Sequence, residues 1–363
     1  MLPIVKVRLP APEILMPRLE EVLYSGMIAE GEQVYEFERR FATLFDLPGV
    51  LAFSSGTGAL HVALLICGVK PEAEVITTSM TAEPTNTTIL QIGAHPVFAD
   101  VHPATGNLDP ASVERLVTSR TRAIVVVHYA GYPANMPALR DIANRHGVML
   151  IEDCAHALGA RIGGQAVGTV GDAAIFSFQA IKHMTTVDGG ALVLRDPARV
   201  SDARKLRWFG MEKGVARTSV DITQAGFKYN MTNVAATIGL CQLKNIGQAI
   251  EAHKSNGHFY DHALANTAGL TVVPKQEDSE PSYWLYTLLA DDPSEIERKL
   301  RAIEVTASKL HRPNHYHSAF ASYRRPLPGL DEFYRRLVHI PCGWWVTQSD
   351  RERIVDALTA PSG

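Results

Sequence analysis

Between residues 50 and 200, the sequence alternates short apolar runs with segments of helix length. Such runs, rich in valine, isoleucine and alanine, are typical of strands that are buried on both faces. Apolar strands that alternate with helices predict an α/β fold, in which helices cover both faces of a mostly parallel sheet. The predicted strands span residues 50–53, 74–78, 96–100, 123–128, 148–153, 173–178 and 190–194.

The pattern changes after residue 250, which predicts a second, smaller domain. A long helix is predicted from residue 234 to about 254, and a helix at 12–25 and a further segment at 31–45 precede the first strand. Two apolar runs and one helix then follow, at 270–274, 283–289 and 293–303, as in a small α+β domain. We therefore predict a large domain over residues 1–250 and a small domain over 251–363.

Composition excludes several classes of function. The formal net charge is −3 and no long basic run occurs, so neither a nucleic acid nor an anionic membrane surface is indicated as a partner. No apolar stretch reaches the ~20 residues of a membrane span, and the first residues do not resemble a signal peptide. The four cysteines are scattered and form no CxxC pair, which favours a reducing cytoplasm over a disulfide framework or a zinc ribbon.

The most informative single residue is Lys182, which closely follows the predicted strand 173–178. A lysine is costly to bury, and one held among apolar neighbours loses its proton more easily. It then becomes an amine nucleophile that can form a Schiff base. Asp153 ends the predicted strand 148–153, and the carboxyl ends of parallel strands meet at one edge of a sheet. Asp153 is therefore predicted either to pair with a pyridinium nitrogen or to cap a helix.

A glycine-rich turn between the first predicted strand and the helix at 58–67 offers an anion site. Gly56 and Thr57 lie in this turn, where backbone N–H groups at a helix N-terminus attract phosphate. A plain serine-capped turn is the alternative. Together with Asp153, Lys182 and the hydroxyl of Ser177, the turn forms a constellation suited to pyridoxal 5'-phosphate.

At this point the chain resembles the DegT/DnrJ/EryC1/StrS family of sugar aminotransferases, which have an aspartate-aminotransferase-like fold. The resemblance runs nearly end to end. It rests on the stretches 25–31, 55–57, 152–159, 176–182, 185–190 and 226–232. It implies a pyridoxal phosphate-dependent transferase of fold type I, with a mostly parallel sheet of the seven-stranded type.

The resemblance also implies roles for individual residues. Lys182 matches the lysine that forms the Schiff base and shuttles a proton. Asp153 matches the partner of the pyridine nitrogen, and His156 matches a position beside the cofactor hydroxyl. Gly56, Thr57 and Ser177 match residues that contact the cofactor phosphate. In the family, a segment equivalent to 226–231 crosses a dimer interface toward the partner's phosphate, and Lys228 or Asn230 would make that contact. The implied assembly is a homodimer with composite active sites.

In the family, an amino group moves from glutamate to a keto sugar that is linked to a nucleotide. The polar stretch 311–317 resembles one near the sugar nucleotide, so His311, Arg312, Asn314 and His317 are the candidate substrate-binding residues. Arginine suits diphosphate oxygens. No carboxylate or cysteine completes a ligand set in this stretch, so no metal is expected there.

Two departures from the family pattern leave alternatives open. Ala82 stands where an aromatic residue often stacks on the cofactor ring, and Val187 stands where glycine is usual. The absent aromatic residue is the one feature that favours a non-catalytic regulator that binds cofactor or sugar nucleotide. A related branch of dehydratases has histidine at the lysine position, whereas this chain has Lys182 and places His183 after it. Amine transfer is therefore the favoured function.

Overall fold

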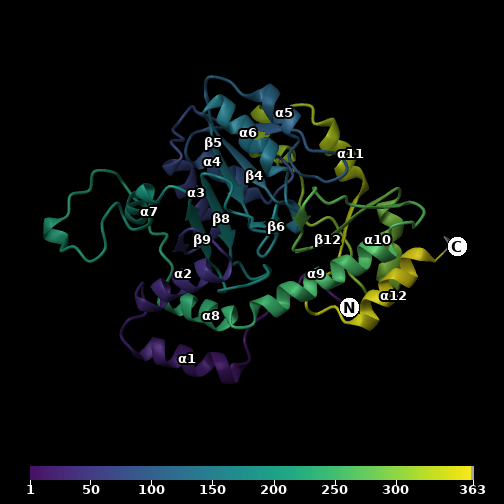
Figure 1. Ribbon diagram of the computed structural model, residues 1–363, viewed down its shortest axis with the longest axis horizontal. Helices are drawn as coiled ribbons and strands as arrows, with labels where there is room; N and C mark the ends of the chain where they lie inside the picture. The colour runs from purple at the N-terminus through teal and green to yellow at the C-terminus, as the bar shows by residue number, and fades with distance from the viewer. Residues whose placement is uncertain (361–363) are drawn as a thin grey trace.

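The computed structural model describes residues 1–360, and its centre is a seven-stranded sheet (Figure 1). The strand order is β1-β9-β8-β5-β4-β2-β3. All neighbouring pairs are parallel except those that β9 makes with β1 and β8. The predicted α/β fold and the predicted strands are thus confirmed. The strands are β1 (Val50–Phe53), β2 (Glu74–Thr78), β3 (His95–Ala99), β4 (Thr121–Val127), β5 (Met149–Asp153), β8 (Ala173–Ser177) and β9 (Gly190–Leu194).

Helices cover both faces of this sheet, because successive side chains of each strand point to opposite faces. Ala174 and Phe176 of β8 pack in one apolar cluster with α2 and α8, whereas Ala173 and Ile175 pack in another with α3 and α7. The helices of the first 243 residues are α1 (Pro12–Tyr24), α2 (Glu32–Leu44), α3 (Gly56–Ile66), α4 (Glu83–Gln91), α5 (Pro110–Leu116), α6 (Met136–His146), α7 (Val200–Arg207) and α8 (Asn233–Leu243).

The single long helix predicted from residue 234 is wrong in one respect. The structure divides it into α8 and α9 (Ile246–Ala263), with Lys244 and Asn245 between them. Asn245 has φ −130° and ψ 13°, outside the helical region. Asparagine is a poor helix former and a preferred residue at helix starts, so it permits the chain to change direction here. In Figure 1, α8 lies below the sheet and α9 runs on toward the C-terminal part.

The C-terminal part has its own three-stranded sheet, ordered β10-β12-β13. Its elements are β10 (Leu270–Val272), β12 (Tyr286–Ala290), α10 (Pro293–Ala302), α11 (Pro328–Arg336), β13 (Leu337–Ile340) and α12 (Gln348–Thr359). They share one apolar cluster, to which Ile4 near the N-terminus also belongs. Because α9 runs across residue 250, the domain boundary there stays a prediction.

A further small sheet escaped the sequence analysis because its strands are only two residues long: β6 (Arg161–Ile162), β7 (Gln165–Ala166) and β11 (Ser279–Glu280). Within residues 1–360, no helix combines the length and apolar character that a membrane crossing requires.

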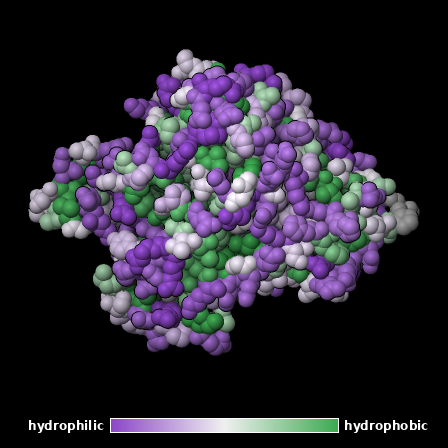
Figure 2. All heavy atoms as spheres, in the orientation of Figure 1, coloured by the Kyte–Doolittle hydropathy of each residue, from purple (hydrophilic) through white to green (hydrophobic). Residues whose placement is uncertain are grey.

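Between α7 and α8 the chain forms an arm, residues 208–228, that projects from the body (Figure 1). Hydrophobic side chains lie on its surface, as Figure 2 shows at the left of the molecule. Val215 is 44% exposed and Ile222 is 52% exposed.

Candidate active site

The polar residues predicted at the strand ends meet at one edge of the central sheet. Asp153 ends β5 and Ser177 ends β8. Ser177 pairs with Gly190 of β9, which in turn pairs with Phe53, the last residue of β1. A cavity of about 310 Å³ lies at this edge, within the usual size range of ligand sites. The predicted residues that line it are Gly56, Thr57, Asp153, His156, Ser177, Lys182 and His311.

One wall of the cavity is the N-terminus of α3, which begins at Gly56, two residues earlier than predicted. Ser55 caps the helix by accepting a hydrogen bond from the N–H of Gly58 (3.0 Å). The N–H groups of Gly56 and Thr57 open the helix and have no intrahelical acceptor. A β-carbon on Gly56 would lie 3.0 Å from the β-carbon of Ser177, so glycine lets the Ser177 hydroxyl lie beside the helix end. This wall can bind an anion.

Lys182 lies in the loop between β8 and β9 and faces the cavity. Its Nζ lies 3.9 Å from the ring centroid of Trp284. The residue is half-buried. Burial lowers the pKa of Lys182 to about 7, and the neighbouring Asp153 carboxylate opposes this shift. Near neutral pH, Lys182 therefore exists as both amine and ammonium.

The Asp153 carboxylate is held by two donors. Its Oδ2 accepts a hydrogen bond from the Thr85 hydroxyl (2.9 Å), and its Oδ1 accepts one from the N–H of Ala155 (3.1 Å). Burial raises the pKa of Asp153, although both donors and Lys182 favour the ionised form. A cation in the cavity would compensate this carboxylate.

His156 belongs to a cluster of three nearly parallel rings, with Trp284 and His311. Its ring centroid lies 4.1 Å from that of Trp284, with 20° between the ring planes. The ring centroid of His311 lies 5.4 Å away, with 5° between the planes. Burial lowers the pKa of both histidines, and that of His311 to about 3, so both rings are neutral. The Nδ1 of His156 and the Nε2 of His311 are buried and have no hydrogen-bond partner in the described chain. Buried polar atoms normally have partners, so these two indicate a polar ligand.

Lys228 and Asn230 do not line this cavity. They lie where the arm returns to the body, and the Nζ of Lys228 donates a hydrogen bond to the Oδ1 of Asn230 (2.6 Å). The same Nζ lies 4.1 Å from the ring centroid of Trp208. Their predicted contact is with a partner's phosphate, and it stays a prediction.

The four candidate substrate-binding residues have different environments in the structure. His311 lines the cavity, Arg312 is exposed, and His317 lies 3.6 Å from the Glu83 carboxylate. Asn314 is fully buried, where its amide nitrogen donates to the carbonyl of Thr81 (2.8 Å) and its oxygen accepts from Asn86 (2.8 Å). These bonds tie Asn314 to α4 and to the loop that precedes it.

Both departures from the family pattern have structural consequences. Ala82 lines the cavity as the residue that precedes α4, and its methyl group adds no aromatic surface there. Val187 has φ 75°, in the left-handed region, and its side chain is 62% exposed. A β-branched residue is strained in this conformation, which glycine adopts freely. The family's usual glycine is thus explained by the backbone of this turn.

Replacing Val187 with glycine should therefore stabilise the protein. The left-handed conformation costs about 1–2 kcal/mol for a residue with a β-carbon, and the flexibility of glycine in the unfolded chain offsets part of this gain. We expect the thermal unfolding midpoint of Val187→Gly to rise by roughly 1–2 °C. Val187→Ala is the matched control, because it retains the β-carbon and should change little. A lower midpoint for the glycine variant would contradict the strain.

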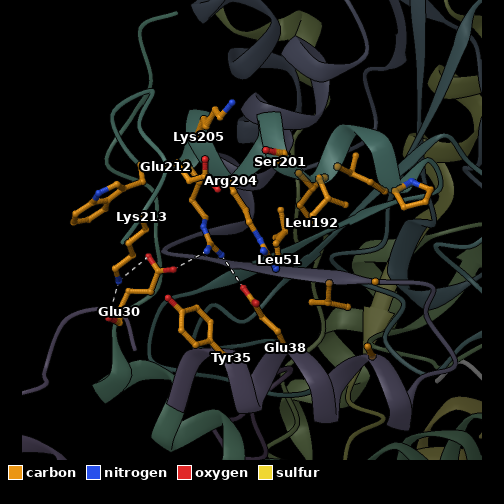
Figure 3. Close-up of a pocket in the computed structure, with 18 of the residues that line it drawn as sticks. Glu30, Tyr35, Glu38, Leu51, Leu192, Ser201, Arg204, Lys205, Glu212 and Lys213 are labelled. Carbon is orange, nitrogen blue, oxygen red and sulfur yellow. Dashed lines mark hydrogen bonds and ion pairs between the residues drawn. The ribbon is translucent and has the colours of Figure 1, made fainter. Parts of the chain in front are cut away.

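A larger cavity, of about 880 Å³, lies elsewhere, between α2, α7 and the base of the arm (Figure 3). Its buried charges are paired with one another. Arg207 binds Glu30 and Glu38 at 2.8 Å each, and Lys213 lies 3.4 Å from Glu30. This network joins α2 to the arm and contains none of the predicted catalytic residues.

Three other side chains, His128, Glu152 and Cys154, lie close enough together to hold a metal ion. The carboxylate of Glu152 is already engaged: it accepts hydrogen bonds from the N–H groups of Gly168, Val170 and Gly171, and it contacts His128 at 3.1 Å. Glu152 therefore anchors the loop at 168–171.

Sequence reasoning missed two residues of the site. Thr85 donates a hydrogen bond to Asp153, which lies 68 residues later in the chain. Trp284 contacts Lys182, which lies 102 residues earlier. Neither follows from spacing, because both contacts depend on the tertiary fold. Trp284 belongs to the apolar run 283–289, which predicts a strand, but it lies two residues before β12 begins at Tyr286.

Comparisons with known proteins find matches over nearly the whole chain. Residues 12–359 match the model of the DegT/DnrJ/EryC1/StrS aminotransferase family. The spore coat polysaccharide biosynthesis protein SpsC of Bacillus subtilis is 31% identical over 356 residues, which are 93% of this chain and 92% of that protein. The structure of AtS13 from Actinomadura melliaura has a TM-score of 0.96 and 36% identity, over 100% of this chain and 99% of AtS13. The sugar aminotransferase CalS13 from Micromonospora echinospora has a TM-score of 0.95 and 36% identity, over 99% of each chain.

Proposed function

The chain belongs to the DegT/DnrJ/EryC1/StrS aminotransferase family, and we propose that it transfers an amino group from glutamate to a keto group of a nucleotide-linked sugar, with pyridoxal 5'-phosphate as cofactor. One observation carries the proposal. A half-buried lysine with a pKa lowered to about 7 faces the same cavity as a buried carboxylate and an open helix N-terminus. Each of the three matches a different part of the cofactor.

The residues present fit pyridoxal phosphate. The phosphate suits the N–H groups of Gly56 and Thr57 and the hydroxyl of Ser177, where a β-carbon on Gly56 would crowd Ser177. A protonated pyridine nitrogen suits Asp153, whose buried carboxylate needs a cation. The partnerless Nδ1 of His156 is a further polar contact. When bound, the cofactor supplies an electron sink for the carbon that bears the amine.

Lys182 has two tasks in this proposal. As a free amine it is the nucleophile that binds the cofactor, and as an ammonium it donates a proton to the reacting carbon. A pKa near the working pH serves both tasks, since neither form is then scarce. The four unpaired, buried cysteines suit a reducing cytoplasm as the site of the reaction.

We further propose a homodimer with composite sites. The arm exposes Val215, Ile222 and Phe209, and the exposed Val187 lies on the loop that holds Lys182. Burying the three side chains of the arm against a second copy would remove apolar surface from water. The arm leads back to Lys228 and Asn230, which would then reach the partner's phosphate.

The proposal is tested with purified protein that has been incubated with pyridoxal phosphate. It should be yellow, and glutamate should bleach the visible band as 2-oxoglutarate forms. Nucleotide-linked 3-keto and 4-keto sugars should restore the band, and the sugar that does so identifies the substrate. Protein that stays colourless would favour a regulator. Loss of a sugar hydroxyl without amine transfer would favour a dehydratase.

A further inference from the structure

Trp284 contacts the segment of Lys182 in two ways. The Nζ of Lys182 lies 3.9 Å from the indole centroid, well within the ~6 Å at which a cation is attracted to an aromatic face. The indole Nε1–H donates a hydrogen bond to the carbonyl of Ile181, the residue before Lys182 (2.9 Å). The ring therefore holds both the backbone next to the lysine and the end of its side chain.

The orientation of this indole is fixed by its surroundings. Trp284 is only 2% exposed, and the ring of His156 stacks on it at 4.1 Å. Its backbone lies so close to Gly131 that a β-carbon there would be 2.7 Å from the Trp284 nitrogen. Tyr283, just before it, has φ 46°, a strained conformation that turns the chain at this point. Strain of this kind persists where the surrounding structure imposes it, often at functional sites.

Only one of the charged and titratable side chains described below stabilises the positive charge of Lys182, so the indole can contribute to that stabilisation. Asp153, at the end of β5, is the acid that favours the ammonium form of Lys182. His156, His183 and His311 also face the lysine, and all three are neutral because burial lowers their pKa values. The negative face of the indole is a second group that stabilises the positive charge.

We propose that Trp284 is a positioning residue that holds the side chain of Lys182, with its proton, whenever the lysine is not bonded to the cofactor. This inference rests on the proposed function, because an aminotransferase frees its lysine from the cofactor in the first half of its cycle and re-forms that bond only at the end of the second half. The contact with the indole keeps the released amine in the cavity, oriented for its return. It also makes a residue of the C-terminal part a component of the lysine site.

The test measures the pKa of Lys182 in the full-length, cofactor-free chain by trace labelling with acetic anhydride at a series of pH values, with the Lys182 peptide quantified by mass spectrometry. In Trp284→Leu, which lacks the aromatic face, we expect the pKa to fall by roughly one unit. Trp284→Phe keeps an aromatic ring but is a weaker partner, so a fall of about half a unit is expected. Lys228 is the matched control lysine, because it lies over a different tryptophan, Trp208, and its pKa should not move in either variant.

The direction of the shift separates this role from a merely structural one. Loosened packing would admit water and raise the pKa of Lys182, whereas loss of the cation–π contact lowers it. An unchanged or raised pKa would overturn the proposal. If Trp284→Leu does not fold, the pKa of Lys182 in Trp284→Phe alone tests the proposal. The labelling uses neither sugar nor amino donor, so its failure is distinct from failure of the proposed function, which would be seen as wild-type protein that glutamate does not bleach.

Discussion

Lys182→Ala is expected to abolish turnover, with a loss of at least about 10⁴-fold in kcat. The variant loses both the amine that binds the cofactor and the group that moves the proton. Its cavity should still bind the cofactor's phosphate, because the N-terminus of α3 is unchanged. The measurement is the rate of amino transfer with glutamate, together with the absorbance spectrum of the bound cofactor. A small free amine such as methylamine should restore part of the lost activity.

The control for this variant is Lys299→Ala. Lys299 lies on α10, where it donates to the carbonyl of Ala360 (2.8 Å) and lies 3.3 Å from Glu295. Removing this peripheral lysine should leave the rate within about two-fold, as surface substitutions usually do. If Lys182→Ala transferred amino groups as fast as Lys299→Ala, Lys182 would have no catalytic role.

Asp153→Asn is expected to show the second largest effect, a fall in kcat of roughly 10²- to 10³-fold. The amide keeps the size of the side chain but carries no charge to stabilise a protonated ring nitrogen. Breaking a buried ion pair costs about 3–5 kcal/mol, and each ~1.4 kcal/mol in the barrier is a factor of ten in rate. The rate of amino transfer checks the size of the loss, and the cofactor spectrum checks that the cofactor is still bound.

Thr85→Val is the matched control for Asp153. It removes one of the two donors to the carboxylate and leaves the charge in place. A hydrogen bond to a charged group contributes about 1.5–3 kcal/mol. Because the second donor and the charge of Asp153 remain, we expect a loss at the lower end of this range, roughly ten-fold. Equal losses in the two variants would mean that the orientation of Asp153, and not its charge, matters to the reaction.

The part of the site that could be predicted follows from local rules. Asp153 ends an apolar strand, and Gly56 begins the helix that follows another strand. Since parallel strands place their carboxyl ends at one edge, these residues had to converge. The apolar runs are strong signals because a sheet covered on both faces needs nearly continuous hydrophobic strands. Lys182 could be found because it follows such a strand.

The rest of the site depends on contacts between residues far apart in the chain. Trp284 reaches Lys182 across 102 positions, and Asn314 turns its amide inward to Asn86 and Thr81. The polar stretch at 311–317 looks uniform in sequence, yet Asn314 is fully buried while Arg312 is exposed. Local composition does not distinguish these two positions, because the packing of the C-terminal part against the loop before α4 decides which side chain is buried.

A peptide map tests most directly whether Lys182 is the residue that binds the cofactor covalently. The full-length protein is incubated with pyridoxal 5'-phosphate, reduced with sodium borohydride to fix the cofactor on its lysine, digested and analysed by mass spectrometry. We predict the phosphopyridoxyl group on the peptide that contains Lys182, and its loss from that peptide when glutamate is added before reduction. A cofactor fixed on another lysine, or a label on Lys182 that glutamate does not remove, would contradict the assignment.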